Sequence, residues 1–229
     1  MREAHRIRGT RSWSRTLTIP AVAALLAGSA GSAGAAALAA GPGPVVGPGG
    51  KVAGQGYPYW LRAANRTFFA DGGTPPLCQT LHAPGGAVEF LDGADTDQPI
   101  TCRAPAEEPI YVHGIANECS TLHGDHAGFG TSATQLEQCA RKGFKGLHGT
   151  ASVDGVPVAN YPELISAAAV VEARLPRHNA FHLAPQRMRS ASYGEGLLLR
   201  GLTAGTHTIV VKSFTSGGNQ QRKFVVHVS

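Results

Sequence analysis

The sequence predicts a mainly β protein: an antiparallel β-sandwich, immunoglobulin-like or jelly-roll-like, with one short helix and two disulfides. The first observation is a run of alternating apolar and polar residues near the C-terminus, because successive side chains of a strand leave opposite faces. The second is a high content of turn-forming residues, with 30 Gly and 15 Pro among 229 residues. The third is that only one segment, 132–142, has the pattern of a clear helix.

The first 40 residues, 1–40, have the pattern of a secretory signal peptide. Five arginines precede a short apolar core at 19–26, and small residues at 35–39 offer cleavage sites. An uncleaved membrane anchor is the alternative, since 16–40 carries no charge, although its many Gly, Ala and Ser residues are weakly apolar. The predicted localisation is secreted, with contact to a membrane only through an uncleaved leader.

The leader also explains the basic character of the chain. The whole sequence has 20 Lys and Arg against 15 Asp and Glu, a net charge of +5. Without the five arginines and one glutamate of the leader, 15 basic and 14 acidic residues remain, a net charge of +1. A nucleic-acid interface needs clustered basic residues, and only the short group Arg141, Lys142 and Lys145 approaches one. Nucleic acid is therefore excluded as a partner.

Two further segments complete the predicted domain organisation. Segment 41–56, GPGPVVGPGGKVAGQG, is rich in Gly and Pro and is expected to be a flexible linker. A single sandwich domain then spans 57–229 and opens on the aromatic residues Tyr57, Tyr59 and Trp60. Such a cluster either fills a core or offers a surface to a ligand ring. Tyr59 and Trp60 are therefore candidate ligand-binding residues.

Four cysteines in an exported chain predict two disulfides. They are Cys78, Cys102, Cys119 and Cys139. Three pairings are open, and Cys78–Cys102 with Cys119–Cys139 is favoured because each of these bonds closes a local loop. Zinc is the alternative, but the chain has no Cys-x-x-Cys pair.

The helix expected at 132–142 has signals at both ends. Ser132 and Gln135 have the spacing of a capping box, and Gly143 follows the last turn. Cys139 would then attach this helix to the strand that precedes Cys119. The strands expected before the C-terminal hairpin are 87–91, 109–116, 150–158 (with an Asp-Gly turn) and 171–175.

The C-terminal hairpin consists of an alternating strand at 206–214, a Gly- and Asn-containing turn at 216–219 and a second strand at 223–228. It resembles the last two strands of bacterial immunoglobulin-like modules. The matching residues are Leu202, Gly205, His207, Ile209, Val211, Gly218, Asn219, Phe224 and Val226. The resemblance implies a sandwich fold, in which His207 takes the place of a structural corner residue that hydrogen-bonds back to the backbone.

A wider pattern resembles a group of secreted actinobacterial and cyanobacterial proteins: an early Trp, spaced cysteines, Asn-x-Glu-Cys-Ser, a Val-Asp-Gly turn and a Gly-x-His-x-Ile strand. The matching residues are Trp60, Cys78, Cys102, Pro105, Asn117, Cys119, Ser120, Cys139, Val153, Asp154, Gly155, Gly205, His207 and Ile209. The resemblance implies an exported protein, and it carries over no activity and no catalytic residue.

Two segments offer metal ligands. In DGADTD, the carboxylates of Asp92, Asp95 and Asp97 are close enough in sequence to bind calcium, although an Asp- and Gly-rich turn explains them equally well. His123 and His126 could hold zinc or copper, although the glycines around them are typical of a loop. No metal or other cofactor is expected.

No catalytic motif stands out, and no Gly-x-Ser-x-Gly elbow occurs. Glu118 could join Glu89 as a carboxylate pair for glycoside chemistry, and Ser120 could pair with a histidine. The predicted function is a secreted, non-catalytic binding or interaction module at the cell envelope or outside the cell. Its extracellular or cell-envelope ligand is unknown. The alternative is a secreted hydrolase, dependent on carboxylates or a metal, that acts on glycans. The candidate ligand-binding residues are Tyr59, Trp60, Glu118, His123 and His126.

Overall fold

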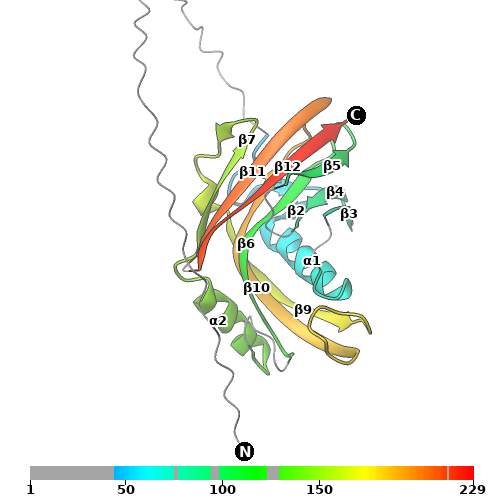
Figure 1. Cartoon of the computed structure of the whole chain (residues 1–229), viewed down its shortest axis with the longest axis vertical. Helices are drawn as coiled ribbons and strands as arrows, with labels where there is room; N and C mark the ends of the chain where they lie inside the picture. The colour runs from blue at the N-terminus through cyan, green and yellow to red at the C-terminus, as the bar shows by residue number, and fades with distance from the viewer. Residues whose placement is uncertain (1–43, 75–76, 94–97, 123–128, 216) are drawn as a thin grey trace, which may run out of the picture. The chain divides into compact units, whose positions relative to one another are not determined.

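The computed structural model describes residues 44–74, 77–93, 98–122, 129–215 and 217–229 (Figure 1). The chain divides into two units, Met1–Ala39 and Ala40–Ser229. The predicted leader 1–40 lies outside the described residues, so everything below concerns the second unit. In the described part of the chain, no helix is both long and apolar enough to cross a membrane.

Two five-stranded sheets form the domain. The first sheet has the strand order β3-β4-β6-β10-β9, and the second has the order β5-β12-β11-β7-β8. Most neighbours are antiparallel, but β4 pairs with β6, and β5 with β12, in parallel. The strands of the first sheet are β3 (Cys78–Ala83), β4 (Gly86–Leu91), β6 (Ile110–Ser120), β9 (Ile165–Leu175) and β10 (Gln186–Leu199). Those of the second are β5 (Ile100–Ala104), β7 (His148–Val153), β8 (Val156–Pro157), β11 (Gly205–Thr215) and β12 (Gly218–Val228).

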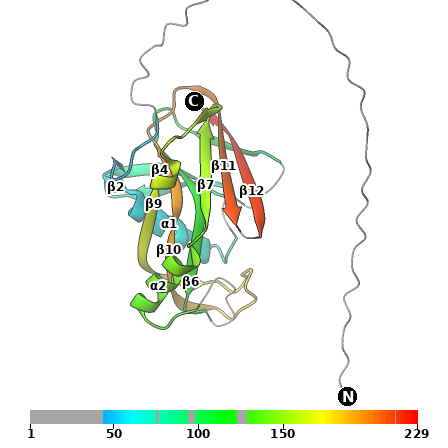
Figure 2. The same cartoon turned by 90° about the vertical axis from the view of Figure 1, so that its left-hand side faces the viewer.

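The two sheets share one apolar core, so the domain is a β-sandwich, as predicted. Phe90 and Leu197 of the first sheet and Ile209 and Phe224 of the second are all fully buried in the same cluster. Figure 2 shows β7, β11 and β12 as a layer beside β6, β9 and β10. Burial of apolar area between such layers is the main stabilising contribution, at about 25 cal/mol per Å².

The C-terminal hairpin predicted from alternation is present. β11 and β12 pair in unbroken antiparallel register from Gly205↔Val228 to Thr215↔Gly218. Ile209 and Val211 point into the core, as the alternation requires. The turn uses Gly218, whose φ of +132° is accessible mainly to glycine.

Helix α1 (Tyr57–Ala70) was not predicted from the sequence. It is the first long element of the described chain, after two short strands. Pro58 lies in its first turn, where the missing N–H costs nothing. Trp60, Leu61 and Ala64 recur at helical spacing on its buried face. The described residues therefore contain two α-helices rather than the one predicted, because the aromatic residues of this segment belong to an amphipathic helix.

The segment predicted as a linker, 41–56, is part of the domain from residue 44 onward. Val46 and Val52 are buried in the main core. The Val46 N–H donates to the carbonyl of Leu198 at 2.9 Å, and the Tyr57 hydroxyl donates to the carbonyl of Val46. Two short strands, β1 (Lys51–Val52) and β2 (Gln55–Gly56), form a small sheet beside it. The linker prediction was wrong because it rested on the Gly and Pro content alone, whereas the apolar side chains of Val46 and Val52 bring the segment into the core.

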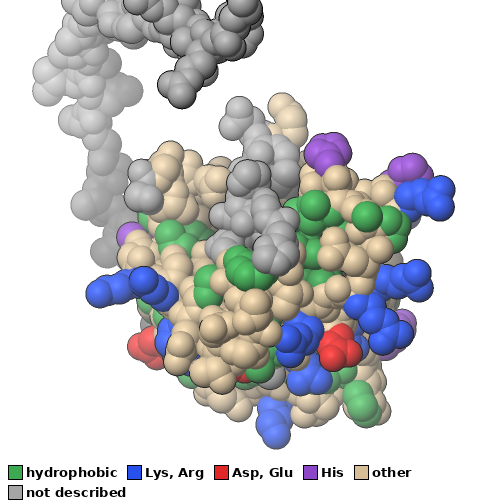
Figure 3. Space-filling model, turned by 90° about the horizontal axis from the view of Figure 1, so that it is seen from below, with side chains coloured by type: hydrophobic (Ala, Val, Ile, Leu, Met, Phe, Trp, Pro, Cys, Tyr) green, Lys and Arg blue, Asp and Glu red, His purple; other side chains and the backbone are tan. Residues whose placement is uncertain are grey.

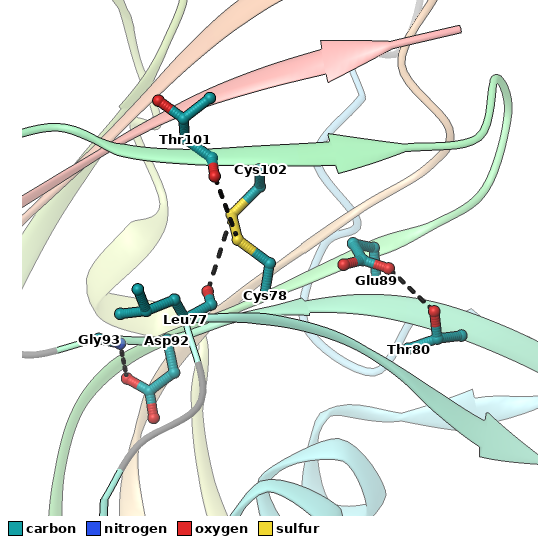
Figure 4. The surroundings of a disulfide bond; sticks show 8 residues. All are labelled: Leu77, Cys78, Thr80, Glu89, Asp92, Gly93, Thr101 and Cys102. Atoms are coloured by element: carbon teal, nitrogen blue, oxygen red, sulfur yellow. Dashed lines mark hydrogen bonds between the residues drawn. A yellow bond between two sulfur atoms is a disulfide. The ribbon is translucent and has the colours of Figure 1, made fainter.

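Both predicted disulfides are present. Cys78–Cys102 joins edge strand β3 of the first sheet to edge strand β5 of the second, with Cα atoms 5.8 Å apart (Figure 4). Cys119–Cys139 joins β6 to helix α2 (Ala133–Gly143). Each closes a loop of 24 or 20 residues, which in the chain-entropy model stabilises the fold by roughly 3 kcal/mol. One bond thus joins the sheets, and the other attaches a helix to a sheet.

The two helices pack on opposite faces of the first sheet, beyond the region covered by the second. On one face, Asn65 of α1 bonds to Ser190 of β10. On the other, Cys119, Leu136, Ala140 and Ala191 form a separate buried cluster under α2. The predicted capping box of α2 is present, because the Ser132 hydroxyl accepts from the Gln135 N–H at 3.2 Å.

One carboxyl lies in the core of the sandwich. Glu195 of β10 is 1% exposed, and burial raises its pKa from 4.5 to about 7, partly offset by a hydrogen bond from the Gly149 N–H. Among the described residues, neither its Oε2 nor the hydroxyl of buried Tyr161 has a hydrogen-bond partner. The folded protein therefore favours the neutral form of this carboxyl.

This burial predicts a pH dependence of stability. Between pH 4.5 and 7 the folded state keeps the Glu195 proton that the unfolded chain releases, so the free energy of unfolding falls as the pH rises, by roughly 3 kcal/mol over this window. Urea titrations of Glu195→Gln should show this fall reduced by about that amount. The exposed Glu137→Gln control should keep the wild-type slope; equal slopes in all three proteins would contradict the prediction.

Candidate functional site

A cavity of about 380 Å³ lies between helix α1, strand β6 and the β11–β12 hairpin. Its volume is within the range typical of small-ligand sites. One wall is mainly apolar and comes from α1 and from β6. The other is polar and comes from the end of β4 and from β6, β10, β11 and β12. The apolar lining residues are Leu61, Ala64, Phe68, Ile115 and Ala116, and the polar ones are Asn65 on the α1 side and Asp92, His113, Asn117, Glu118, Ser192, Ser213, Gln220 and Arg222.

A charged cluster occupies the polar wall. Asp92 follows the last residue of β4 and accepts from its neighbour Gly93 N–H at 2.7 Å. Its two carboxylate oxygens lie 3.0 Å from His113 Nδ1 and 3.0 Å from an Arg222 guanidinium nitrogen. The other guanidinium nitrogen of Arg222 donates to the carbonyl of Gly114 at 2.6 Å. Arg222 thus spans from the second sheet to the first.

The Asp92 cluster carries its charges with little access to water. Asp92 is 5% exposed and Arg222 is 8% exposed. Burial alone would raise the pKa of Asp92, but the hydrogen bond and charge of His113, together with Arg222, hold it below its usual value. Asp92 is therefore ionised at neutral pH and fixes the orientation of the His113 ring.

A second hydrogen-bonded group lies at the α1 side of the cavity. The Ser190 hydroxyl donates to Glu118 Oε1 at 2.5 Å, and the Asn65 amide donates to Ser190 Oγ at 3.0 Å. Glu118 and Ser190 come from neighbouring strands β6 and β10, and Asn65 comes from α1. The helix is therefore attached to the sheet by polar groups next to the cavity.

The described members of the predicted ligand-binding set, Tyr59, Trp60 and Glu118, do not form one site. Glu118 lines the cavity, but Trp60 is fully buried, and its indole N–H donates to the carbonyl of Gln55. Trp60 therefore has no surface to offer a ligand, and its assignment to a binding surface is corrected. Tyr59 is half-buried against the core with its ring edge-on to Trp60 at 5.0 Å. His123 and His126 lie outside the described residues.

Of the predicted metal ligands, Asp92 alone lies within the described residues. Of the acidic loop, Asp95 and Asp97 lie outside the described residues, whereas Asp92 binds His113 and Arg222. Within the described segments, no group of three or more His, Cys, Asp or Glu side chains could hold a metal ion.

His207 lies in β11, two residues after the strand begins at Gly205. Its Nε2 is 2.9 Å from the carbonyl of Thr203, which is the backbone contact expected of a corner residue, and its Nδ1 is 2.7 Å from Asp154. The hydrogen bond to Asp154 raises the pKa of His207 above its usual value. This histidine belongs to the turn structure rather than to the cavity.

Arg222 and His113 are the members of the charged cluster that the sequence analysis did not single out. A signal for Arg222 exists: Arg222, Phe224, Val226 and Val228 share the inward-facing parity of β12. A charged residue at an inward position of an alternating strand requires a buried partner of opposite charge. The inward position of Arg222 therefore indicates a buried carboxylate as its partner, which the structure identifies as Asp92.

Comparisons with known proteins add little. No protein-family model and no curated protein matches the sequence. Similar solved structures include amebosin in solution, 12% identical, with 56% of this chain and 88% of that chain covered at a TM-score of 0.23. PbICP-C in complex with falcipain-2 is 15% identical, with 61% and 97% covered and a TM-score of 0.23. The cysteine protease inhibitor EhICP2 from Entamoeba histolytica is 11% identical, with 56% and 86% covered and a TM-score of 0.19. TM-scores this low carry no argument about this chain.

The ion pair in the cavity wall predicts a large loss of stability when one partner is removed. Arg222→Met leaves the buried Asp92 carboxylate without its guanidinium partner, and should lower the free energy of unfolding by about 3–5 kcal/mol. Urea denaturation at pH 7 measures the loss. Lys223→Met, on the exposed side of the same strand, is the matched control and should change stability by less than about 1 kcal/mol. The double variant Asp92→Asn/Arg222→Met should recover part of the loss.

Proposed function

We propose that this protein is a non-catalytic binding module that works in an oxidising compartment outside the cytoplasm. Its ligand places a group with an apolar body and a polar head in the cavity between α1 and β6. The observation that carries this proposal is the cavity itself, with one apolar wall and one wall of oriented polar groups. Pockets of this composition are the usual sites for small ligands and for single side chains of larger ones.

The polar wall suits binding because its groups are already oriented. Asp92 is fixed by Gly93, His113 and Arg222, and Glu118 is fixed by Ser190. A ligand would therefore meet groups that lose little conformational entropy on binding. The two disulfides support an oxidising location, since such bonds persist there and are rare in the cytoplasm.

One observation favours the second candidate, a hydrolase. His113 lines the cavity and has its Nδ1 held by a buried carboxylate, which is the orientation that a general base requires. A nucleophile is the missing part: among the described residues, no hydroxyl lies within hydrogen-bond distance of the His113 ring. For this reason binding is the function that the cavity supports best.

The binding proposal predicts that filling the cavity abolishes ligand capture. Benzyl alcohol, benzylamine and benzoate share one apolar body and differ in their polar heads, so they serve as probes. Saturation-transfer NMR should detect at least one of them on the wild type and not on Ala64→Met, whose longer side chain would occupy the cavity. Ala70→Met, an exposed position on the same helix, should bind as the wild type does.

Two results would contradict the proposal. One is that no probe binds the folded wild type, and the other is that Ala64→Met, folded as judged by its NMR spectrum, binds as well as Ala70→Met. The hydrolase alternative has a separate readout: turnover of phenyl acetate by the wild type that is lost in His113→Gln without loss of probe binding.

A further inference from the structure

A group of arginines lies on the face of the first sheet opposite the cavity. In the β9–β10 ladder, Arg187 is directly opposite Arg174, and the next pair on the same face is Arg189 opposite Glu172. The alternation of the strands turns these side chains away from α1, because Ala173 and Met188 between them pack in the cluster beneath that helix. The arginine face is therefore separate from the proposed ligand cavity.

This face is hollowed as well as charged. A surface depression of about 610 Å³ is lined by Arg174, Arg187, Arg189, Glu172 and Thr121, together with Ala173 and Met188. Figure 3, which looks at the molecule from below, shows more Lys and Arg than Asp and Glu side chains on this end. Three positive charges thus meet one negative charge around the depression.

The Arg174–Arg187 pair is unfavourable as it stands. Like charges directly opposite each other in an antiparallel ladder destabilise the sheet. Both side chains are exposed, and within the described residues neither takes part in a hydrogen bond or an ion pair. An anion between the two guanidinium groups would remove this repulsion.

The third arginine is already held in place. A guanidinium nitrogen of Arg189 donates to the carbonyl of Thr131 at 2.7 Å, and its backbone N–H donates to Thr121 Oγ1 at 3.0 Å. A fixed guanidinium beside two free ones provides donors in several directions, which suits a group with several acceptor oxygens. Guanidinium groups bind phosphate and similar oxyanions through paired hydrogen bonds.

From this arrangement we propose that the depression on β9 and β10 binds a tetrahedral oxyanion, a phosphate or sulfate group, between Arg174 and Arg187, with Arg189 as an additional donor. The group comes from a free or esterified anion, or from a lipid headgroup. In either case the chemistry of the contact is the same.

The test uses the thermal unfolding of the whole domain in phosphate, in sulfate and in chloride at equal ionic strength. Phosphate and sulfate also stabilise proteins without binding to a site, because they are excluded from the surface. The variants must therefore separate a specific effect from this general one. Arg174→Gln and Arg187→Gln remove the site, and Arg103→Gln removes an exposed strand arginine in the second sheet.

We expect phosphate to raise the midpoint of unfolding more in the wild type and in Arg103→Gln than in Arg174→Gln or Arg187→Gln. Titration of the arginine side-chain N–H signals by NMR should show phosphate binding about tenfold or more weaker in the two site variants. In chloride, Arg187→Glu should unfold at a higher temperature than the wild type, because it replaces the repulsion with an attraction.

Vesicles of phosphatidylcholine, with and without phosphatidylglycerol, distinguish the sources. Binding of free phosphate that depends on Arg174 and Arg187 supports a soluble or esterified anion. Binding only to the phosphatidylglycerol vesicles, lost in both variants, supports a lipid headgroup. The proposal is overturned if phosphate acts equally on all four proteins and the vesicles bind the site variants as they bind the wild type.

Discussion

Arg222 holds the two sheets in register from the inside. It belongs to β12 of the second sheet, and its guanidinium binds Asp92 and the carbonyl of Gly114 in the first. A buried guanidinium without partners is costly, so the sheets cannot slide or open at this point without exposing both charges. The cavity lies beside this contact and depends on it for its shape.

Strand β10 gives the first sheet two different surroundings along its length. Toward its C-terminal end, Leu197, Leu198 and Leu199 are buried in the core of the sandwich. Toward its N-terminal end, the same strand lies between the two helices. The register shifts at Ser190–Ser192 and Gly194–Gly196 separate these regions, and bulges of this kind bend and twist a strand. At Gly196 any side chain would meet the ring of Tyr111.

Much of this fold could be predicted from the sequence, and the reasons are local. The hairpin of β11 and β12 follows from alternation, the start of α2 follows from Ser132, and the two disulfides follow from four spaced cysteines. The end of α2 was placed one residue early, because Gly143 is still helical and Phe144 is the C-cap. Helix α1 was missed because its aromatic residues were read as a cluster rather than at helical spacing. The segment from residue 44 was missed because Val46 joins the core through Leu198, a contact far away in sequence.

The site could be predicted less well than the fold, for a physical reason. Glu118 was singled out, and it does line the cavity. However, Asp92, His113 and Arg222 come from three separate elements, and only the folding of both sheets brings them within 3.0 Å. No spacing in the sequence encodes that meeting. The pairing of Arg174 with Arg187 could not be predicted from the sequence for the same reason, since it depends on the register between β9 and β10.

The parallel pairing of β5 with β12 has a consequence for biogenesis. Ile100 pairs with Phe224, so β5 has to wait for more than half of the described chain to be synthesised before it finds its neighbour. Contacts this distant in sequence form late and slowly. Until then the inner edge of β5 is uncovered. The same delay leaves that edge open to mispairing with other chains. The exposure of this edge to mispairing ends when β12 pairs with β5.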